Sequence, residues 1–269
     1  MGSGEVRPYS VSFLSFGSLI ASSRLRAEIP QAELTKIGVR RGTDMLVYGK
    51  HILNKVPKFA PHIFDVCDDH FNNPTLGDYY RLHVKEADAV TCNSEVMREI
   101  VSRETGRDAV AIPDPYESEE RPADMGYGLL WYGHESNLKT ILPYMNLGVS
   151  ILSGRDWSRD KQLDMLEGCA VVLIPTDERK GKSANRMIEA IRNGRFVVAG
   201  ELPAHDEFKD FMWVGDITEG VTWALQNRNE AIARVKAAQD YIREKYSPAA
   251  IARQWLTVLD TVWQQATAR

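Results

Sequence analysis

The sequence predicts an α/β protein with two consecutive parallel-sheet domains and a helical C-terminal tail. Short apolar runs of strand length alternate with segments whose apolar residues recur at helical spacing, a pattern that favours parallel sheets. The segment 113–126 interrupts this pattern with three prolines and five acidic residues, so we interpret it as a connection between two domains. The alternation then restarts and gives way to helical spacing over residues 229–268.

The elements of the first domain follow from apolar runs that end at glycine, proline or polar residues. We expect strands at 11–16, 44–48, 63–67, 89–92 and 109–112, and helices at 22–38, 76–87 and 94–104. Ser22 or Ser23 is expected to cap the first helix and Ser94 the third. A serine hydroxyl at this position accepts a hydrogen bond from the backbone N–H groups that a helix start leaves unpaired.

The elements of the second domain are predicted in the same way. We expect strands at 129–132, 149–152, 171–174, 196–199 and 212–214, and helices at 137–145, 161–166, 184–191, 218–226 and 229–268. The last helix is expected to break at Ser247-Pro248 because proline disrupts a helix interior. Residues 196–199 show no polar alternation, which is typical of a strand buried on both faces.

Composition narrows the class of protein. The chain has 269 residues, 43% of them hydrophobic, and a formal net charge of −4. No basic stripe indicates a duplex nucleic-acid partner, and the apolar runs are too short to span a bilayer. The three cysteines are scattered without metal-ligand spacing, and no secretory signal is recognisable. We therefore expect reduced thiols, a cytoplasmic location and no integral membrane association. The oligomeric state stays open.

The corner between the strand at 171–174 and the helix at 184–191 is the main candidate site. It carries polar and cationic residues beside a glycine, namely Gly181, Lys182, Ser183, Asn185 and Arg186. Helix N-termini attract anions, and Glu189 is expected two turns beyond Lys182 on the same helix face. A nucleoside diphosphate fits this pattern, with phosphates at the corner and ribose hydroxyls on Glu189. The alternative is a solvated surface helix, and the spacing excludes a P-loop.

The first domain offers weaker candidates. Gly17 and Ser18 follow the first strand and could admit a phosphate, although no GxGxxG fingerprint is present. Arg24 and Arg26 lie nearby, with an exposed helix face as the simpler interpretation.

Carboxylates and an imidazole gather in the segment DVCDDHF, which ends the strand at 63–67. Asp68, Asp69 and His70 could act as a general base or bind a substrate hydroxyl. The alternative is that these residues only cap a helix and form turns. One loop does not establish the convergent ligands of a metal site, so none is assigned.

Three segments resemble those of nucleotide-sugar glycosyltransferases with the GT-B fold, in the retaining group of glycogen synthases and mannosyltransferases. These segments are ADAVTCNSEVMREIV…TGRDAVAIPDP, LLWYGHESNLK and IPTDERKGKSANRMIEAIRNGRFVVAGELPAHDEF. The resemblance covers nearly the whole chain. It implies two Rossmann-like domains: an acceptor-side domain at 1–115, a linker at 116–127, a donor-binding domain at 128–246 and a helix at 247–269 that packs back towards the first domain.

The resemblance also implies roles for single residues. Glu189 matches a glutamate that holds the donor ribose, whereas Gly181 stands where the family has another glutamate, which departs from the pattern. The donor phosphates would meet Gly133, His134, Asn137 and Lys139 in the second domain and Gly17 and Ser18 in the first. His70, Asp68 and Asp69 fall near the acceptor, and Lys182 would neutralise the leaving diphosphate.

The implied function is transfer of a hexose from a UDP-sugar co-substrate to a hydroxyl, with no cofactor or metal required. A glycan, a small molecule or a hydroxymethylated base in DNA are the acceptors considered. Because Gly181 departs from the motif, one alternative is a glycosyltransferase-like module that binds a nucleotide without turnover. A nucleotide-sugar epimerase of similar architecture is a further alternative.

Overall fold

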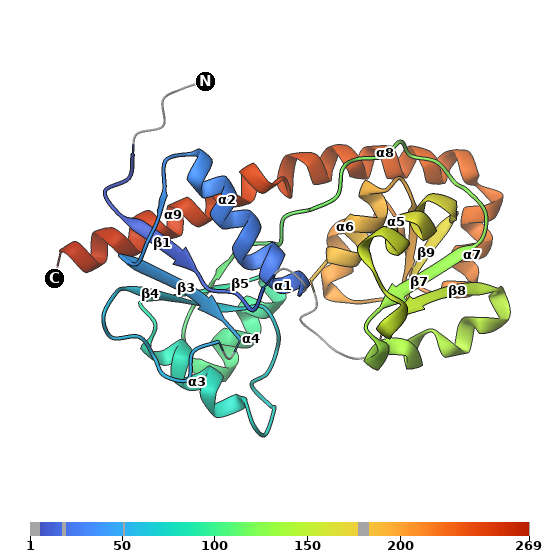
Figure 1. Cartoon of the computed structure of the whole chain (residues 1–269). Coiled ribbons are helices and arrows are strands. Elements are labelled where there is room, and N and C mark those ends of the chain that lie inside the picture. Colours follow the sequence, from blue (N-terminus) through green and yellow to red (C-terminus); the bar gives the residue numbers. More distant parts are fainter. Residues whose placement is uncertain (1–5, 18–19, 51, 177–182, 269) are drawn as a thin grey trace. The chain divides into compact units, whose positions relative to one another are not determined.

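The computed structural model describes residues 6–17, 20–50, 52–176 and 183–268. The chain forms two compact units, which are described one at a time (Figure 1). Unit 1 contains the residues up to Tyr116 and those from Lys245 onward. Unit 2 contains nearly all of the residues between them. Both units are α/β structures built on a parallel sheet, as the sequence predicts.

Unit 1 is built on a sheet of parallel strands in the order β2-β1-β3-β4-β5-β6. Its strands are β1 (Ser10–Phe13), β2 (Arg40–Arg41), β3 (Met45–Gly49), β4 (His62–Val66), β5 (Ala89–Cys92) and β6 (Val110–Ala111). Its helices are α1 (Ala21–Ser23), the π-helical turn η1 (Arg24–Glu28), α2 (Ile29–Lys36), α3 (Gly77–Glu86), α4 (Glu95–Thr105) and α9 (Pro248–Thr267). Ser94 caps α4 as predicted, because its hydroxyl accepts a hydrogen bond from the Met97 N–H at 3.2 Å.

The first helix starts earlier than predicted. It begins at Ala21 after Ile20, so Ser22 and Ser23 lie inside it and neither is its cap. The Ser23 hydroxyl instead accepts a hydrogen bond from the Phe16 N–H at 3.1 Å. The strand also ends at Phe13, before the predicted residue 16, because the chain turns there towards the helix. This serine therefore fixes the loop after β1.

The last helix completes the core of unit 1. α9 packs beside α2, and its buried Ile251, Trp255 and Leu259 join Val11 and Leu34 in one hydrophobic cluster (Figure 1). Ser247 caps α9 and Pro248 occupies its first turn, which confirms the predicted break before this helix. Residues far apart in sequence thus share one core.

A second cluster in unit 1 buries a histidine. His83 is completely buried, and its Nδ1 lies 2.8 Å from the hydroxyl of Tyr48. Burial, together with the neighbouring His62, lowers the pKa of His83 from 6.5 to about 4. The folded unit therefore favours the neutral imidazole, whereas the unfolded chain binds a proton below pH 6.5.

Unit 1 should lose stability in mild acid for this reason. Between pH 6.5 and pH 4 the unfolded state binds more protons at His83, so stability falls as the pH falls. We expect the free energy of unfolding to drop by about 3 kcal/mol more in the parent than in His83→Phe between pH 7 and pH 4. Urea unfolding at both pH values measures this. Equal pH dependence in the two proteins would contradict the assignment.

Unit 2 is built on a parallel sheet in the order β11-β10-β9-β7-β8. Its strands are β7 (Leu129–Gly133), β8 (Val149–Ser153), β9 (Val171–Ile174), β10 (Phe196–Ala199) and β11 (Trp213–Val214). Its α-helices are α5 (Arg159–Gly168), α6 (Asn185–Arg192), α7 (Ile217–Gln226) and α8 (Arg228–Lys245). Its short 3-10 helices are η2 (Glu135–Thr140), η3 (Leu142–Leu147), η4 (Gly154–Asp156) and η5 (Pro203–Phe208).

The segment predicted as one helix at 137–145 is helical but forms no continuous α-helix. This region forms the 3-10 helices η2 and η3, which meet at Ile141. Pro143 has no backbone N–H and disfavours a continuous α-helix through the segment. The tighter turns satisfy the neighbouring backbone groups within fewer residues.

The acidic, proline-rich segment after Tyr116 is held on unit 2. The Arg121 N–H donates to the Arg192 carbonyl at 2.8 Å, and the Asp124 N–H donates to the Gly194 carbonyl at 3.1 Å. Gly194 has a φ of +76°, and a Cβ there would overlap the backbone carbonyl of Pro122. This glycine is therefore needed for its conformation and for the close approach of the segment.

Alanine at Gly194 should separate these two requirements from one another. Gly148 has a similar φ of +75° but open space around its Cβ position, so it is the matched control. Gly148→Ala should cost about 1–2 kcal/mol of backbone strain. Gly194→Ala should lower the free energy of unfolding by about 1–3 kcal/mol more than Gly148→Ala does, because the new methyl group displaces the segment after Tyr116. Urea unfolding measures both, and equal losses would contradict the packing argument.

Candidate functional site

The corner after β9 contains the predicted nucleotide site. Gly181 and Lys182 lie outside the described residues. Helix α6 begins after them, and Ser183, Asn185 and Arg186 are all partly exposed at its start. Its residues Met187, Ile188 and Ile191 are buried, as the predicted helical spacing requires.

Arg186 reaches from α6 to the carboxyl end of β7. Its Nη1 donates to the Tyr132 carbonyl at 3.3 Å, and the Tyr132 hydroxyl donates back to the Arg186 carbonyl at 2.9 Å. The same Nη1 lies 3.3 Å from the Cβ position at Gly133, so a side chain there would crowd the guanidinium. The structure therefore brings together Arg186 and Gly133, two residues that the sequence assigns to one site.

The loop after β7 carries the other residues predicted to meet phosphate. His134 caps η2, because its Nδ1 accepts a hydrogen bond from the Ser136 N–H at 3.2 Å. Asn137 and Lys139 lie on η2, and Lys139 is exposed. These residues therefore follow Gly133 directly on a short polar helix.

Glu189 is a nearly buried carboxylate on α6, with 9% of its surface exposed. Its Oε1 accepts a hydrogen bond from the Glu117 N–H at 3.2 Å, and its Oε2 pairs with Arg159 Nη2 at 3.2 Å. The other guanidinium arm of Arg159 pairs with the Glu117 carboxylate, also at 3.2 Å. Burial of this carboxylate is thus compensated by one cation and one backbone donor.

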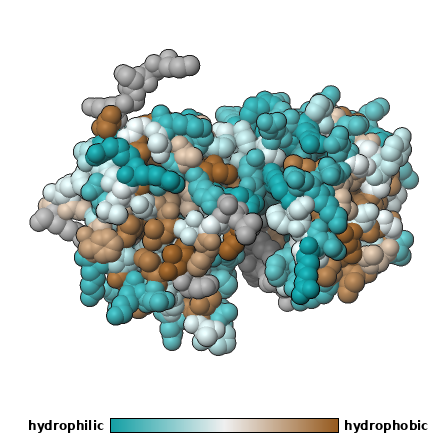
Figure 2. Space-filling model, viewed as in Figure 1, coloured by the Kyte–Doolittle hydropathy of each residue, from teal (hydrophilic) through white to brown (hydrophobic). Residues whose placement is uncertain are grey.

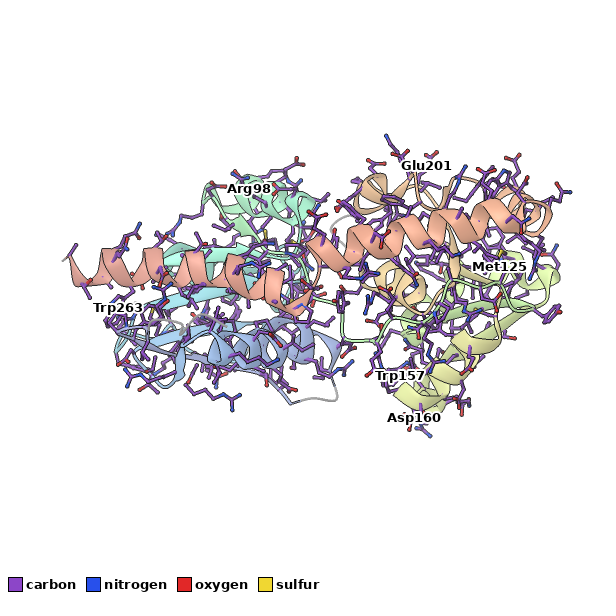
Figure 3. The ribbon with its side chains drawn as sticks, turned by 90° about the horizontal axis from the view of Figure 1, so that it is seen from above. Arg98, Met125, Trp157, Asp160, Glu201 and Trp263 are labelled. Atoms are coloured by element: carbon purple, nitrogen blue, oxygen red, sulfur yellow. The ribbon has the colours of Figure 1, made fainter. Side chains whose placement is uncertain are left out.

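Arg159 was not predicted from the sequence. It is the first residue of α5 and lies in sequence between Trp157 and Asp160, which are labelled in Figure 3. Burial of the Glu189 carboxylate requires a nearby cation, since an isolated buried charge is strongly destabilising. Sequence spacing gives no indication of which cation this is, because Arg159 and Glu189 are 30 positions apart.

The predicted acceptor-side residues in unit 1 each make a different contact. Asp68 pairs with Lys50 at 3.3 Å, and Asp69 accepts a hydrogen bond from the Phe71 N–H at 3.2 Å. The ring of His70 packs edge-on against Tyr80, with 5.2 Å between centroids. The hydrogen bond to Asp69 therefore matches the alternative interpretation from the sequence, in which these residues form turns.

The glycine loop after β1 is only partly described. Gly17 has a φ of +101° and open space at its Cβ position. This conformation favours glycine. Ser18 lies outside the described residues.

Arg26 is buried in unit 1, which corrects the interpretation of an exposed helix face. Its Nε and Nη2 pair with both oxygens of Asp65 at 2.9 and 2.6 Å, and its Nη1 lies 3.2 Å from Asp114. Thr91 also donates to Asp65 at 2.7 Å. Asp65 therefore belongs to a buried ion-pair network and not to the polar cluster that follows β4.

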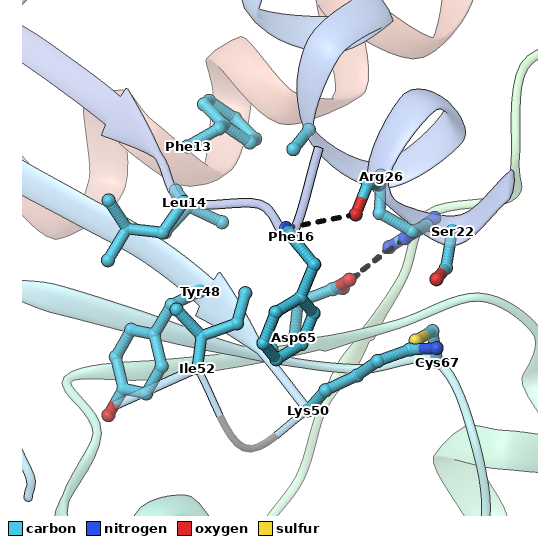
Figure 4. A pocket seen from close by; sticks show the side chains of 14 residues that line it. Phe13, Leu14, Phe16, Ser22, Arg26, Tyr48, Lys50, Ile52, Asp65 and Cys67 are labelled. Carbon is cyan, nitrogen blue, oxygen red and sulfur yellow. Dashed lines mark hydrogen bonds and ion pairs between the residues drawn. The ribbon is translucent and has the colours of Figure 1, made fainter. Parts of the chain in front are cut away.

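A pocket of about 350 Å³ opens in unit 1 where β1, β3 and β4 end (Figure 4). The loop after β1, the helix start and the segment after β3 surround it. Arg26 and Asp65 lie at its inner wall. The sequence gives no sign of this pocket, since it depends on side chains from four separate segments.

Comparisons with known proteins agree on the architecture. No protein-family model and no curated protein matches the chain. Among solved structures, HepE from Anabaena is 13% identical with a TM-score of 0.63, over 91% of this chain and 84% of HepE. The trehalose-phosphate synthase of Burkholderia vietnamiensis is 11% identical with a TM-score of 0.56, over 94% of this chain and 80% of the synthase.

TarM is a third similar structure, 16% identical with a TM-score of 0.60. The match covers 79% of this chain, which spans about half of TarM, since it covers 54% of that protein. These structures are GT-B glycosyltransferases.

The chain has the GT-B fold.

The GT-B resemblance predicted from the three sequence segments is confirmed at the level of fold. No described helix is both long and apolar enough to cross a bilayer. Within the described ranges, no three or more histidine, cysteine, aspartate and glutamate side chains are grouped so as to hold a metal ion. In the GT-B frame, the residues around Arg186 and Glu189 lie in the second Rossmann-like unit and the pocket lies in the first.

Proposed function

We propose that this GT-B protein is a glycosyltransferase that moves a hexose from a UDP-sugar to an acceptor hydroxyl. The fold supports this proposal, and the HepE structure contains UDP and glucose. The synthase from B. vietnamiensis is described as UDP-forming. The proposal includes a cytoplasmic location and no requirement for a metal ion.

The observation that carries the proposal is the placement of Arg186 and Glu189 on the same helix, α6. They are three positions apart, and residues at this spacing lie on neighbouring parts of one helix face. Arg186 would bind the diphosphate beside Gly133, and Glu189 would accept hydrogen bonds from the ribose hydroxyls. Each oxygen of Glu189 makes one hydrogen bond with the protein, and a carboxylate oxygen can accept two.

The proposed reaction breaks the bond between the anomeric carbon and the diphosphate, and the bonding electrons leave with UDP. The acceptor oxygen forms the new bond to that carbon and loses its proton to a base. We propose Asp68 or His70 for this role, with Asp69 shaping the turn. Lys182, Lys139 and Arg186 would stabilise the negative charge that grows on the leaving diphosphate.

Calorimetry with UDP, with and without a chelator, tests the nucleotide site. Arg186→Met should weaken UDP binding about tenfold or more, because charge-assisted hydrogen bonds contribute about 1.5–3 kcal/mol. Lys161→Met is the matched control, since this exposed lysine lies on α5 of the same unit. Binding that needs a divalent ion, or equal binding by both variants, would count against the proposal.

A nucleotide-binding module without turnover is the second candidate. It is favoured by Gly181, which replaces a glutamate of the family motif, and by the ion pair that already engages Glu189. Hydrolysis or transfer of a UDP-sugar, followed by mass spectrometry with glycans, small alcohols and hydroxymethylated DNA, separates the two. Tight UDP binding with no consumption of donor sugars would favour the module.

A further inference from the structure

The pocket of unit 1 has mainly apolar walls. Phe13 and Leu14 come from β1 and the residue after it, Phe16 from the following loop, and Val47 and Ile52 from β3 and beyond (Figure 4). Phe16 is 45% exposed, which is unusual for so large an apolar side chain. Figure 2 also shows brown, hydrophobic residues gathered on the visible face of unit 1. The walls therefore suit a hydrophobic group.

The charged groups of the pocket are compensated within unit 1. Arg26 and Asp65 pair with each other and hold further partners behind the wall. Lys50 pairs with Asp68 beside the pocket. Burial raises the pKa of the Cys67 thiol well above its usual range, so this wall stays neutral. A ligand that carries no net charge therefore fits best.

Lys50 occupies an unusual backbone conformation at this pocket. Its φ of +52° lies in the left-handed region, which costs a residue with a side chain about 1–2 kcal/mol. The preceding Gly49 leaves no room for a side chain, because a Cβ would overlap the Asp65 carbonyl. Such strain is concentrated at functional sites in proteins.

We propose that this pocket binds a neutral, hydroxyl-bearing small molecule through an aromatic ring, and that this molecule is the acceptor of the proposed transfer. The ring would lie against Phe16 and Ile52. Its hydroxyl would accept a hydrogen bond from the Lys50 ammonium and donate one to Asp68. This inference rests on the proposed glycosyltransferase function and narrows the acceptor to an aryl alcohol.

The shape of the pocket favours a small molecule that stays partly in solvent. Its volume of about 350 Å³ includes space open to solvent, so a bound ring would lie at the mouth of the pocket beside the exposed Phe16. A polymer segment such as a glycan or DNA strand would instead need an extended polar or cationic groove. The compensated charges and the aromatic wall do not offer one.

Saturation-transfer NMR with benzyl alcohol tests the proposal on the full chain. Benzyl alcohol should give a signal, whereas glycerol, which has hydroxyls but no ring, and benzoate, which is charged, should give at most a tenth of it. Ser22→Phe should abolish the benzyl alcohol signal, because Ser22 lines the pocket and a phenyl ring would fill it. Ala21→Phe is the matched control, since Ala21 is exposed and outside the lining.

The role of the hydroxyl is tested separately. The parent should bind benzyl alcohol at least threefold more tightly than toluene, and Lys50→Met should remove this difference while Lys55→Met keeps it. Lys55 is an exposed lysine of the same segment. An unchanged preference in Lys50→Met would overturn the assignment of the hydroxyl position.

The same samples distinguish failure of the pocket from failure of the proposed function. If benzyl alcohol binds and UDP does not, the pocket proposal stands and the transferase proposal is overturned. If UDP binds but benzyl alcohol gives no signal, or gives the same signal as glycerol, the pocket proposal is overturned and the transferase proposal stands. A signal that persists equally in Ser22→Phe and Ala21→Phe would show that the alcohol binds elsewhere, which also overturns it.

Discussion

Arg26→Met should lower the free energy of unfolding of unit 1 by about 3–5 kcal/mol. The substitution removes a buried cation and leaves Asp65 with an uncompensated charge, and this loss is much larger than the net value of the ion pair. Only 6% of the Arg26 side chain is exposed, so solvent gives little compensation. Urea unfolding followed by tryptophan fluorescence measures the change, because the Arg26 guanidinium carbon lies 5.3 Å from the centroid of the Trp255 ring.

Arg98→Met is the matched control for this experiment. Arg98, labelled in Figure 3, pairs with Asp108 at 2.9 Å, but its side chain is 44% exposed. Exposed pairs contribute at most about 1 kcal/mol, so this variant should be nearly as stable as the parent. Equal losses in Arg26→Met and Arg98→Met would show that burial does not determine the value of these pairs.

Glu189→Gln should weaken UDP binding about ten- to a hundredfold. The substitution removes the charge from the group proposed to bind both ribose hydroxyls, and charge-assisted hydrogen bonds contribute about 1.5–3 kcal/mol. Glutamine keeps the size of the side chain, so the packing of α6 should be retained. Calorimetry gives the change in affinity, and thermal unfolding reports whether unit 2 is still folded.

Glu167→Gln provides the comparison for Glu189→Gln. Glu167 also pairs with an arginine, Arg121, at 2.7 Å, but its side chain is 68% exposed and lies at the end of α5. This variant should bind UDP like the parent. If Glu189→Gln also binds UDP like the parent, the carboxylate serves only to neutralise Arg159, and the nucleotide lies elsewhere.

The sequence predicted the buried strands with high accuracy and the polar contacts poorly. Strands β5, β9 and β10 have the predicted bounds because each is an uninterrupted apolar run between clear breaks. Pro143 is equally visible in the sequence, yet the apolar spacing predicts one helix over 137–145 where the structure has two 3-10 helices. Local pattern identifies a strand, whereas the choice among helical types depends on individual backbone hydrogen bonds.

From local spacing alone, the candidate site was predictable only where its residues are close in sequence, and the grouping of Gly133 with Arg186 came from the family resemblance. Arg186 and Glu189 follow from the pattern of one helix. The partners Arg159 and Glu117 come from other segments, as does the Arg26 that reaches Asp65 across 39 positions. Such pairs are set by the tertiary fold, which brings the ends of parallel strands together and which no local spacing records.

The position of α9 has a consequence for synthesis of the chain. Its Trp255 and Leu259 belong to the core of unit 1, although more than a hundred residues of unit 2 are translated before them. Unit 2 is nearly continuous in sequence, so it can complete its core while the C-terminus is still inside the ribosome. Most of unit 1 is translated before unit 2, but its hydrophobic core is completed after that of unit 2. Until α9 arrives, the apolar residues of α2 and β1 that it covers would be open to chaperones or to other nascent chains.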